Sequence, residues 1–71
     1  MKAVAKDLVV GTEYWLDDTN QVSGVCVEID TKGDTIRFNK VPGQPDRYAT
    51  DVKGRIIFPV YVPYEYVKVE A

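Results

Sequence analysis

Two-residue alternation of apolar and polar side chains is the feature that most constrains the fold of this chain. Such alternation is typical of strands that bury one face of a sheet and expose the other. It predicts strands over residues 12–17, 24–30, 35–41, 47–52, 55–60 and 66–70. Glycines, prolines and aspartates separate these segments, and none of them shows the 3.6-residue period of a helix. The sequence therefore predicts an all-β protein.

The apolar positions of these segments define the expected core. Tyr14 and Leu16 share one face of the first strand, and Ile36 and Phe38 share one face of the third. Phe58 belongs to a densely apolar fifth segment, which we expect to be buried on both faces. We therefore assign these five side chains to the interior.

A hairpin joins the segments 24–30 and 35–41. Gly33 lies in its turn, residues 31–34, where it can adopt a positive φ at no steric cost. Alternation turns Cys26 outward, together with Glu28 and Asp30. No neighbouring cation lowers the pKa of this thiol, so we expect an unreactive free cysteine, buried in preference to bonded to another chain.

Chain length and cysteine content limit how such strands are stabilised. With 71 residues, the chain is expected to form one domain over residues 1–71. One cysteine excludes an intrachain disulfide, which is typical of a reducing compartment and predicts a cytoplasmic protein. No stretch approaches the length of a membrane span or a signal peptide, so we expect no membrane contact. Closing five or six antiparallel strands into a small barrel would remove exposed sheet edges.

The sequence lacks the residues that several kinds of catalysis require. The chain has no histidine, one cysteine and one serine, so nucleophilic triads and zinc sites have no ligands or base. Its five glycines are isolated and form no phosphate-binding loop. Residue type alone does not exclude catalysis by a pair of carboxylates among Asp17, Asp18, Glu28 and Asp30. We interpret these residues as a solvated sheet face with turn-forming aspartates. We expect no enzyme, no cofactor and no metal.

The segment from Gly54 to Val67, GRIIFPVYVPYEYV, resembles the end of an SH3 domain. In that family a glycine turn leads into a strand, a proline, a 3₁₀ turn and a Tyr-Val pair that opens the last strand. The resemblance implies an SH3-like barrel with a 3₁₀ turn before its last strand. The family's opening motif is absent, since Glu13-Tyr14-Trp15-Leu16-Asp17 stands in its place, and so are its acidic loop and paired tryptophans. Binding of proline-rich peptides is therefore not carried over.

Aromatic residues outside the expected core are the candidates for recognition. They are Trp15, Tyr48, Tyr61 and Tyr64. Arg37 and Arg47 are candidates to flank these aromatic residues in the same binding surface. Tyrosine, tryptophan and arginine are the side chains enriched at interface hot spots. For Trp15, packing on the sheet and partner binding remain open. The loop of residues 42–46, between Pro42 and Asp46, is a second candidate, with a plain connection as its alternative.

These observations predict a non-catalytic protein-binding module, monomeric or a small homo-oligomer. Residues 10–16 look like small uncharacterised proteins of tailed bacteriophages, which suggests an accessory or inhibitory factor aimed at a host protein. Nucleic-acid binding is a second hypothesis. The net charge of −2 and scattered basic residues argue against it, although folding could gather Arg37, Lys40, Arg47 and Arg55. An oligomeric structural subunit of a larger assembly is the third.

Overall fold

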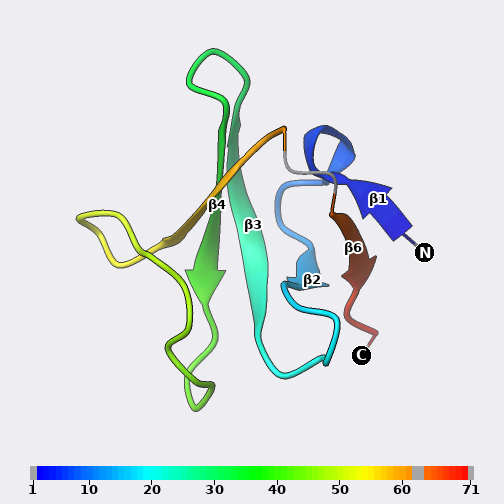
Figure 1. The fold of residues 1–71 in the computed structure, drawn as a ribbon, viewed down its shortest axis with the longest axis vertical. Coiled ribbons are helices and arrows are strands. Elements are labelled where there is room, and N and C mark those ends of the chain that lie inside the picture. Colours follow the sequence, from blue (N-terminus) through cyan, green and yellow to red (C-terminus); the bar gives the residue numbers. More distant parts are fainter. Residues whose placement is uncertain (1, 62–63, 71) are drawn as a thin grey trace.

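The computed structural model describes residues 2–61 and 64–70 and shows an all-β fold (Figure 1). Within these residues one 3₁₀ turn, η1 (Ala5–Asp7), accompanies six strands. The strands are β1 (Lys2–Val4), β2 (Glu13–Trp15), β3 (Ser23–Asp30), β4 (Thr35–Lys40), β5 (Ile56–Pro59) and β6 (Glu65–Lys68). The all-β prediction is confirmed. Strands β2 to β6 each overlap a segment that alternation predicted, whereas β1 was not predicted.

All six strands belong to one antiparallel sheet in the order β1-β6-β2-β3-β4-β5. Strands β2 to β5 follow one another as neighbours, and β6 then returns to lie between β1 and β2. The sheet is open among the described residues, because β1 and β5 form its two ends and do not pair. Antiparallel pairing is thus confirmed, whereas closure into a barrel is not seen.

The free and buried state predicted for Cys26 is confirmed, but its predicted outward direction is wrong, and an irregularity in the β3–β4 ladder explains why. Cys26 pairs with Phe38 and Glu28 pairs with Arg37, which leaves Val27 as an extra residue. Such a bulge reverses the face on which later residues of a strand lie. Cys26 therefore faces the core and is 0% exposed, and Glu28 faces outward. Strict alternation through the strand could not reveal this reversal.

The turn between β3 and β4 is held by the side chain that precedes it. The Asp30 carboxylate accepts hydrogen bonds from the backbone N–H groups of Lys32 (3.1 Å) and Gly33 (3.0 Å). The positive φ falls at Asp34 (54°), and the expectation that Gly33 supplies it is wrong. Gly33 instead permits close approach, because a Cβ there would lie 2.8 Å from an Asp30 oxygen.

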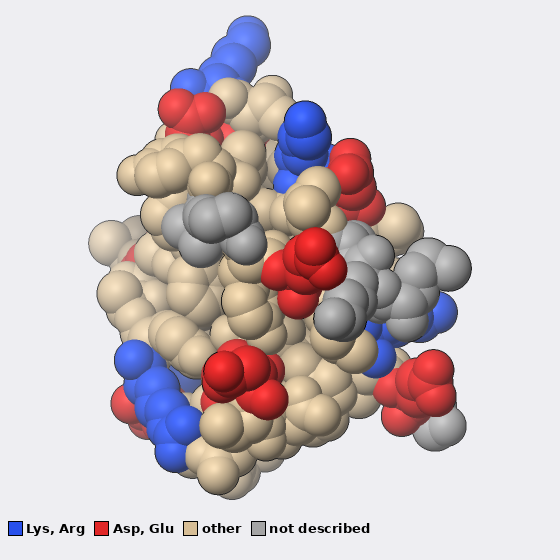
Figure 2. All heavy atoms as spheres, turned by 45° about the vertical axis from the view of Figure 1, so that its right-hand side comes forward, with Lys and Arg blue, Asp and Glu red and all other residues tan. Residues whose placement is uncertain are grey.

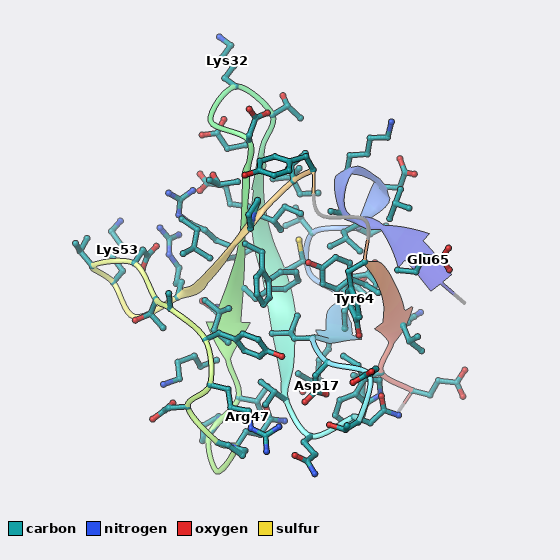
Figure 3. All side chains as sticks on the ribbon, in the orientation of Figure 1. Asp17, Lys32, Arg47, Lys53, Tyr64 and Glu65 are labelled. Atoms are coloured by element: carbon teal, nitrogen blue, oxygen red, sulfur yellow. The ribbon has the colours of Figure 1, made fainter. Side chains whose placement is uncertain are left out.

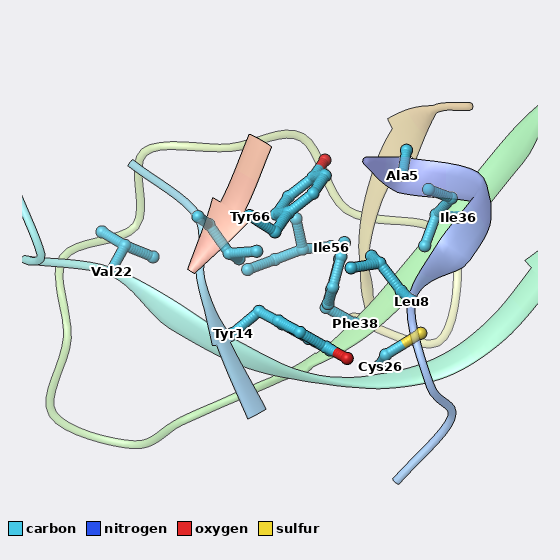
Figure 4. Packing of buried hydrophobic residues seen from close by; sticks show 10 residues of the cluster. Ala5, Leu8, Tyr14, Val22, Cys26, Ile36, Phe38, Ile56 and Tyr66 are labelled. Carbon is cyan, nitrogen blue, oxygen red and sulfur yellow. The ribbon is translucent and has the colours of Figure 1, made fainter. Parts of the chain in front are cut away.

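Aromatic rings form the centre of the core (Figure 4). Tyr66 is 2% exposed and contacts Phe38, Tyr14 and Phe58, with ring centroids 5.6, 6.5 and 6.5 Å apart. Tyr66 is not among the core residues predicted from the sequence, whereas β6 carries it into the interior. The buried hydrophobic residues are Ala5, Leu8, Tyr14, Leu16, Val22, Cys26, Ile36, Phe38, Ile56 and Tyr66.

Two predictions for the second half of the chain are wrong. The expected strand over residues 47–52 contributes only an isolated bridge from Thr50 to Ile56. Strand β5 is not buried on both faces. Ile56 is buried, but the other three residues of the strand are half-buried, including Phe58, which packs against the core. The expected 3₁₀ turn before β6 includes residues 62 and 63, which lie outside the described residues, and the 3₁₀ turn that is seen follows β1.

A network of charges fixes the turn that precedes β5. The Asp51 carboxylate accepts hydrogen bonds from the N–H groups of Lys53 and Arg55, each at 2.9 Å. Its other oxygen pairs with the side chains of Arg55 (2.9 Å) and Arg37 (3.2 Å). Arg37 also pairs with Glu28 at 2.6 Å, so the turn is tied to both β3 and β4.

Replacement of Gly24 by alanine is expected to destabilise the fold strongly. The added Cβ would lie 2.8 Å from the Phe38 Cβ and 3.0 Å from the Asn39 carbonyl oxygen, neither of which can move independently of β4. Overpacking of this kind lowers the free energy of unfolding by about 2–3 kcal/mol. Urea denaturation measures the loss, with the half-buried Val25→Ala as control at about 1 kcal/mol. A Gly24→Ala variant as stable as the parent would contradict the close packing of β3 on β4.

Acid is expected to weaken the Asp51 network. The backbone N–H of Arg55 is the largest of the contacts that hold the pKa of Asp51 below its ordinary value of 3.8. A carboxyl with a lower pKa in the folded state stabilises the protein above its unfolded pKa, and this contribution is lost as the pH falls through the folded value. Asp51→Asn should therefore lower the Tm at pH 7 and have little effect at pH 2.

The matched control for this titration is Asp46→Asn, which changes an exposed carboxylate whose one ion pair among the described residues is with Lys40. Its Tm should stay close to that of the parent at both pH values. Equal Tm differences between Asp51→Asn and the parent at pH 7 and pH 2 would show that the carboxylate charge plays no part.

Candidate functional site

Two of the candidate tyrosines lie on one part of the surface, each supported by a core ring. Tyr48 packs edge to face on Phe58 at 5.0 Å, and Tyr64 packs in the same manner on Tyr66 at 4.8 Å. The Tyr48 hydroxyl also donates to the Leu16 carbonyl at 3.2 Å, across 32 residues of sequence. Both tyrosines are half-buried, so each presents part of a ring that is already held in place.

The loop between β2 and β3 is ordered by Asp17. One carboxylate oxygen accepts from the N–H groups of Gln21 (2.9 Å) and Val22 (3.5 Å), and the other accepts from the Thr19 hydroxyl (3.1 Å). The second oxygen also pairs with Arg47 at 3.6 Å. Partial burial acts to raise the pKa of Asp17, but these donors outweigh it and the pKa lies below its ordinary value.

The tyrosines and the aspartates of this loop share one electrostatic environment. Burial raises the pKa of Tyr48, and the neighbouring Asp17 carboxylate adds to the effect. Burial likewise raises the pKa of Tyr64, followed by the carboxylates of Asp17 and Asp18. We call Asp17, Asp18, Arg47, Tyr48 and Tyr64 the tyrosine–aspartate surface. Figure 3 shows Asp17 and Arg47 at the end of the molecule opposite Lys32, with Tyr64 nearer the middle.

The other three candidate residues lie elsewhere. Trp15 is half-buried on the face of β2 opposite the core, in register with Val67 of β6. Tyr61 is 75% exposed in the turn after β5. Arg37 is engaged by Glu28 and Asp51 on the outer face of β4. The expected single patch is therefore divided, and only Tyr48, Tyr64 and Arg47 share a surface.

Folding pairs each of the four residues considered as a basic patch with an acid. Arg37, Arg47 and Arg55 each bind an aspartate or glutamate, and Lys40 binds Asp46. Figure 2 shows one face on which basic and acidic side chains are interspersed and separated by uncharged atoms. Phosphate recognition depends on clustered basic groups that are available to the ligand.

A polar network that the sequence did not reveal anchors the loop of residues 42–46. The Gln44 amide accepts from the Ser23 N–H at 2.8 Å and donates to the Ser23 hydroxyl at 2.9 Å. That hydroxyl donates in turn to Glu13 at 2.6 Å. Ser23 is 1% exposed, so this network joins the loop to β2 and β3 and presents no nucleophile to solvent. Only the three-dimensional neighbourhood could identify it, because the two partners lie 21 residues apart.

The remaining reactive groups of the described residues are enclosed or dispersed. The Cys26 thiol is fully buried, and burial raises its pKa. Among residues 2–61 and 64–70 no group of three or more acidic or cysteine side chains is placed to hold a metal ion. No helix in the same residues has the length and apolar character needed to cross a membrane.

Removal of the Tyr48 hydroxyl is expected to destabilise the folded protein. Tyr48→Phe keeps the ring contact with Phe58 but leaves the Leu16 carbonyl without this donor. The free energy of unfolding should fall by about 0.5–1.5 kcal/mol in urea denaturation. Tyr61→Phe is the control, since its exposed side chain has no hydrogen bond among the described residues, and it should leave stability unchanged. Equal effects of the two substitutions would argue against the Tyr48 contact.

Comparison of the chain with protein-family models, with curated proteins and with solved structures finds no match. The interpretation of the site therefore depends on the contacts of its own residues. Those contacts describe a pre-ordered surface that combines aromatic rings with charges.

Proposed function

We propose that this protein is a non-catalytic module that binds another protein through the tyrosine–aspartate surface. The observation that carries the proposal is the support of Tyr48 and Tyr64 by core rings while part of each side chain stays accessible. Tyrosine contributes large contact area with few rotatable bonds, and it is enriched with arginine at interface hot spots. Arg47 lies near Tyr48 and pairs with Asp17, whose carboxylate is near both tyrosines.

Pre-organisation strengthens the case for binding. A loop that is already ordered loses little conformational entropy when a partner arrives. Three hydrogen bonds to Asp17 fix the β2–β3 loop, and the Tyr48 hydroxyl ties the segment after β4 to the end of β2. The surface is therefore built from segments that are distant in sequence but held in one arrangement.

The charge of the surface indicates the chemistry of the partner. Two aspartates and one arginine leave one net negative charge, and Asp18 is exposed with no ion pair among the described residues. Complementary charge favours association and selects the partner. We propose a partner segment that offers an apolar or aromatic group to the tyrosines and a basic group to Asp18.

The SH3-like barrel remains part of this proposal. The return of β6 to pair with β2, after a meander from β2 to β5, is compatible with a small barrel-like fold. Closure of that barrel and the bacteriophage origin suggested by residues 10–16 are proposals based on the sequence alone. Nucleic acid is a weaker candidate than protein, because the arginines named as a potential basic patch are bound to carboxylates.

An affinity capture from bacterial lysate tests the protein-binding proposal, with nuclease treatment and mass spectrometry of the retained proteins. Asp18→Lys and Tyr64→Leu should each reduce capture of the main partner at least about tenfold, as expected for hot-spot residues. Asp7→Lys is the matched control, because it makes the same charge change on the exposed η1 turn and should retain capture. Circular dichroism and Tm verify that each variant is folded.

The outcome separates the three hypotheses for function. A partner that survives nuclease and is lost with Asp18→Lys but not with Asp7→Lys supports the surface. Retention of nucleic acid, or loss of all captured proteins after nuclease, would replace the proposal by nucleic-acid binding. Capture only of further copies of this 8.0 kDa chain would favour the structural subunit.

A further inference from the structure

An open pocket lies where the β3–β4 turn meets the end of β5. Its volume is about 470 Å³, within the range of small-ligand sites. Turn residues 33–35 form one side, and Ile57, Phe58, Pro59 and Tyr61 form the other. The two sides are fixed to each other, since the Val60 N–H donates to the Asp34 carbonyl at 2.8 Å and Thr35 is in register with Pro59.

The pocket combines apolar walls with one carboxylate. Ile57 and Pro59 are half-buried, and Tyr61 is the most exposed aromatic side chain of the described residues at 75%. The Asp34 carboxylate has no ion pair or side-chain hydrogen bond among the described residues. Lys32 is the nearest cation in sequence, and Figure 3 shows it extending from the tip of the turn away from the sheet. Among residues 2–61 and 64–70, no cation is therefore paired with Asp34.

We propose that this pocket accepts an arginine side chain of a partner protein. The aliphatic stem would lie on Ile57 and Pro59, and the guanidinium would lie between the Tyr61 ring and the Asp34 carboxylate. An aromatic face and a carboxylate are the two groups that bind guanidinium best, by stacking and by forked hydrogen bonds. Arginine fits better than lysine, because its planar cation is less strongly hydrated and stacks on aromatic rings.

This site goes beyond the proposed function, because it is separate from the tyrosine–aspartate surface. It is built on the turn that carries Lys32, whereas Asp17 and Arg47 lie at the opposite end of the molecule (Figure 3). It also gives a role to Tyr61, which the folded chain places apart from Tyr48 and Tyr64. A protein partner could contact either site without the other.

The test is a titration of the ¹⁵N-labelled protein with Nα-acetyl-arginine amide, followed by NMR. Nα-acetyl-citrulline amide is the matched probe, since it has the same shape and no charge. The arginine probe should give saturable shifts of the amides of Gly33, Asp34, Thr35, Ile57 and Tyr61. Citrulline should bind at least about fivefold more weakly, in line with the loss of one partly exposed ion pair.

Two variants locate the binding groups. Asp34→Asn removes the charge and keeps the turn, because asparagine readily adopts the positive φ of 54° found there. Tyr61→Ser removes the exposed ring, and Asp46→Asn serves as a charge control outside the pocket. We expect about fivefold weaker binding of the arginine probe to each of the first two variants and unchanged binding to the third.

Specific results would overturn the assignment. Equal binding of arginine and citrulline probes would show that the pocket does not recognise the cation. Shifts confined to the amides of residues 17–22, or undiminished binding to Asp34→Asn, would place the cation site elsewhere. If the arginine probe causes no saturable amide shifts at residues 33–35 of the parent protein, the proposal is ruled out.

Discussion

The contact of Tyr66 with Phe38 is the interaction on which the rest of the fold depends. Tyr66 comes from β6 and Phe38 from β4, which are the second strands from the two ends of the sheet, so their packing joins distant strands across one interior. A chain of 71 residues without a disulfide has few other means of holding such distant strands together. Burial strongly raises the pKa of Tyr66, because ionisation would place a charge among these rings.

The candidate binding surface is an outer layer of the same aromatic stack. Tyr48 packs on Phe58 and Tyr64 packs on Tyr66, so these contacts fix the position of the accessible parts of both rings. The core thus positions the two rings, while the hydrogen bonds of Asp17 order the loop beside them. The same arrangement couples recognition to stability, since a change in the core rings would displace the tyrosines that meet a partner.

Alternation predicted the all-β fold, the hairpin and the burial of Tyr14, Leu16, Ile36 and Phe38, because period-2 burial is a local property of a regular strand. It failed for Cys26, where one extra residue in β3 reverses the faces. For the site, residue type indicated Tyr48, Tyr64 and Arg47, but no local pattern could separate them from Trp15 and Tyr61. That division depends on which strands pair, and the ties from Gln44 to Ser23 and from Tyr48 to Leu16 likewise join distant segments.

In each of three turns of this protein, the side chain of the first residue, an aspartate, accepts hydrogen bonds from the backbone of later turn residues. Asp17, Asp30 and Asp51 each accept backbone N–H groups from residues two to five positions ahead. Such bends can form before any distant strand arrives, and they reduce the chain entropy that must be lost when neighbouring strands meet. We therefore expect the local bends to form before β6 arrives, because its partners β1 and β2 lie far back along the chain.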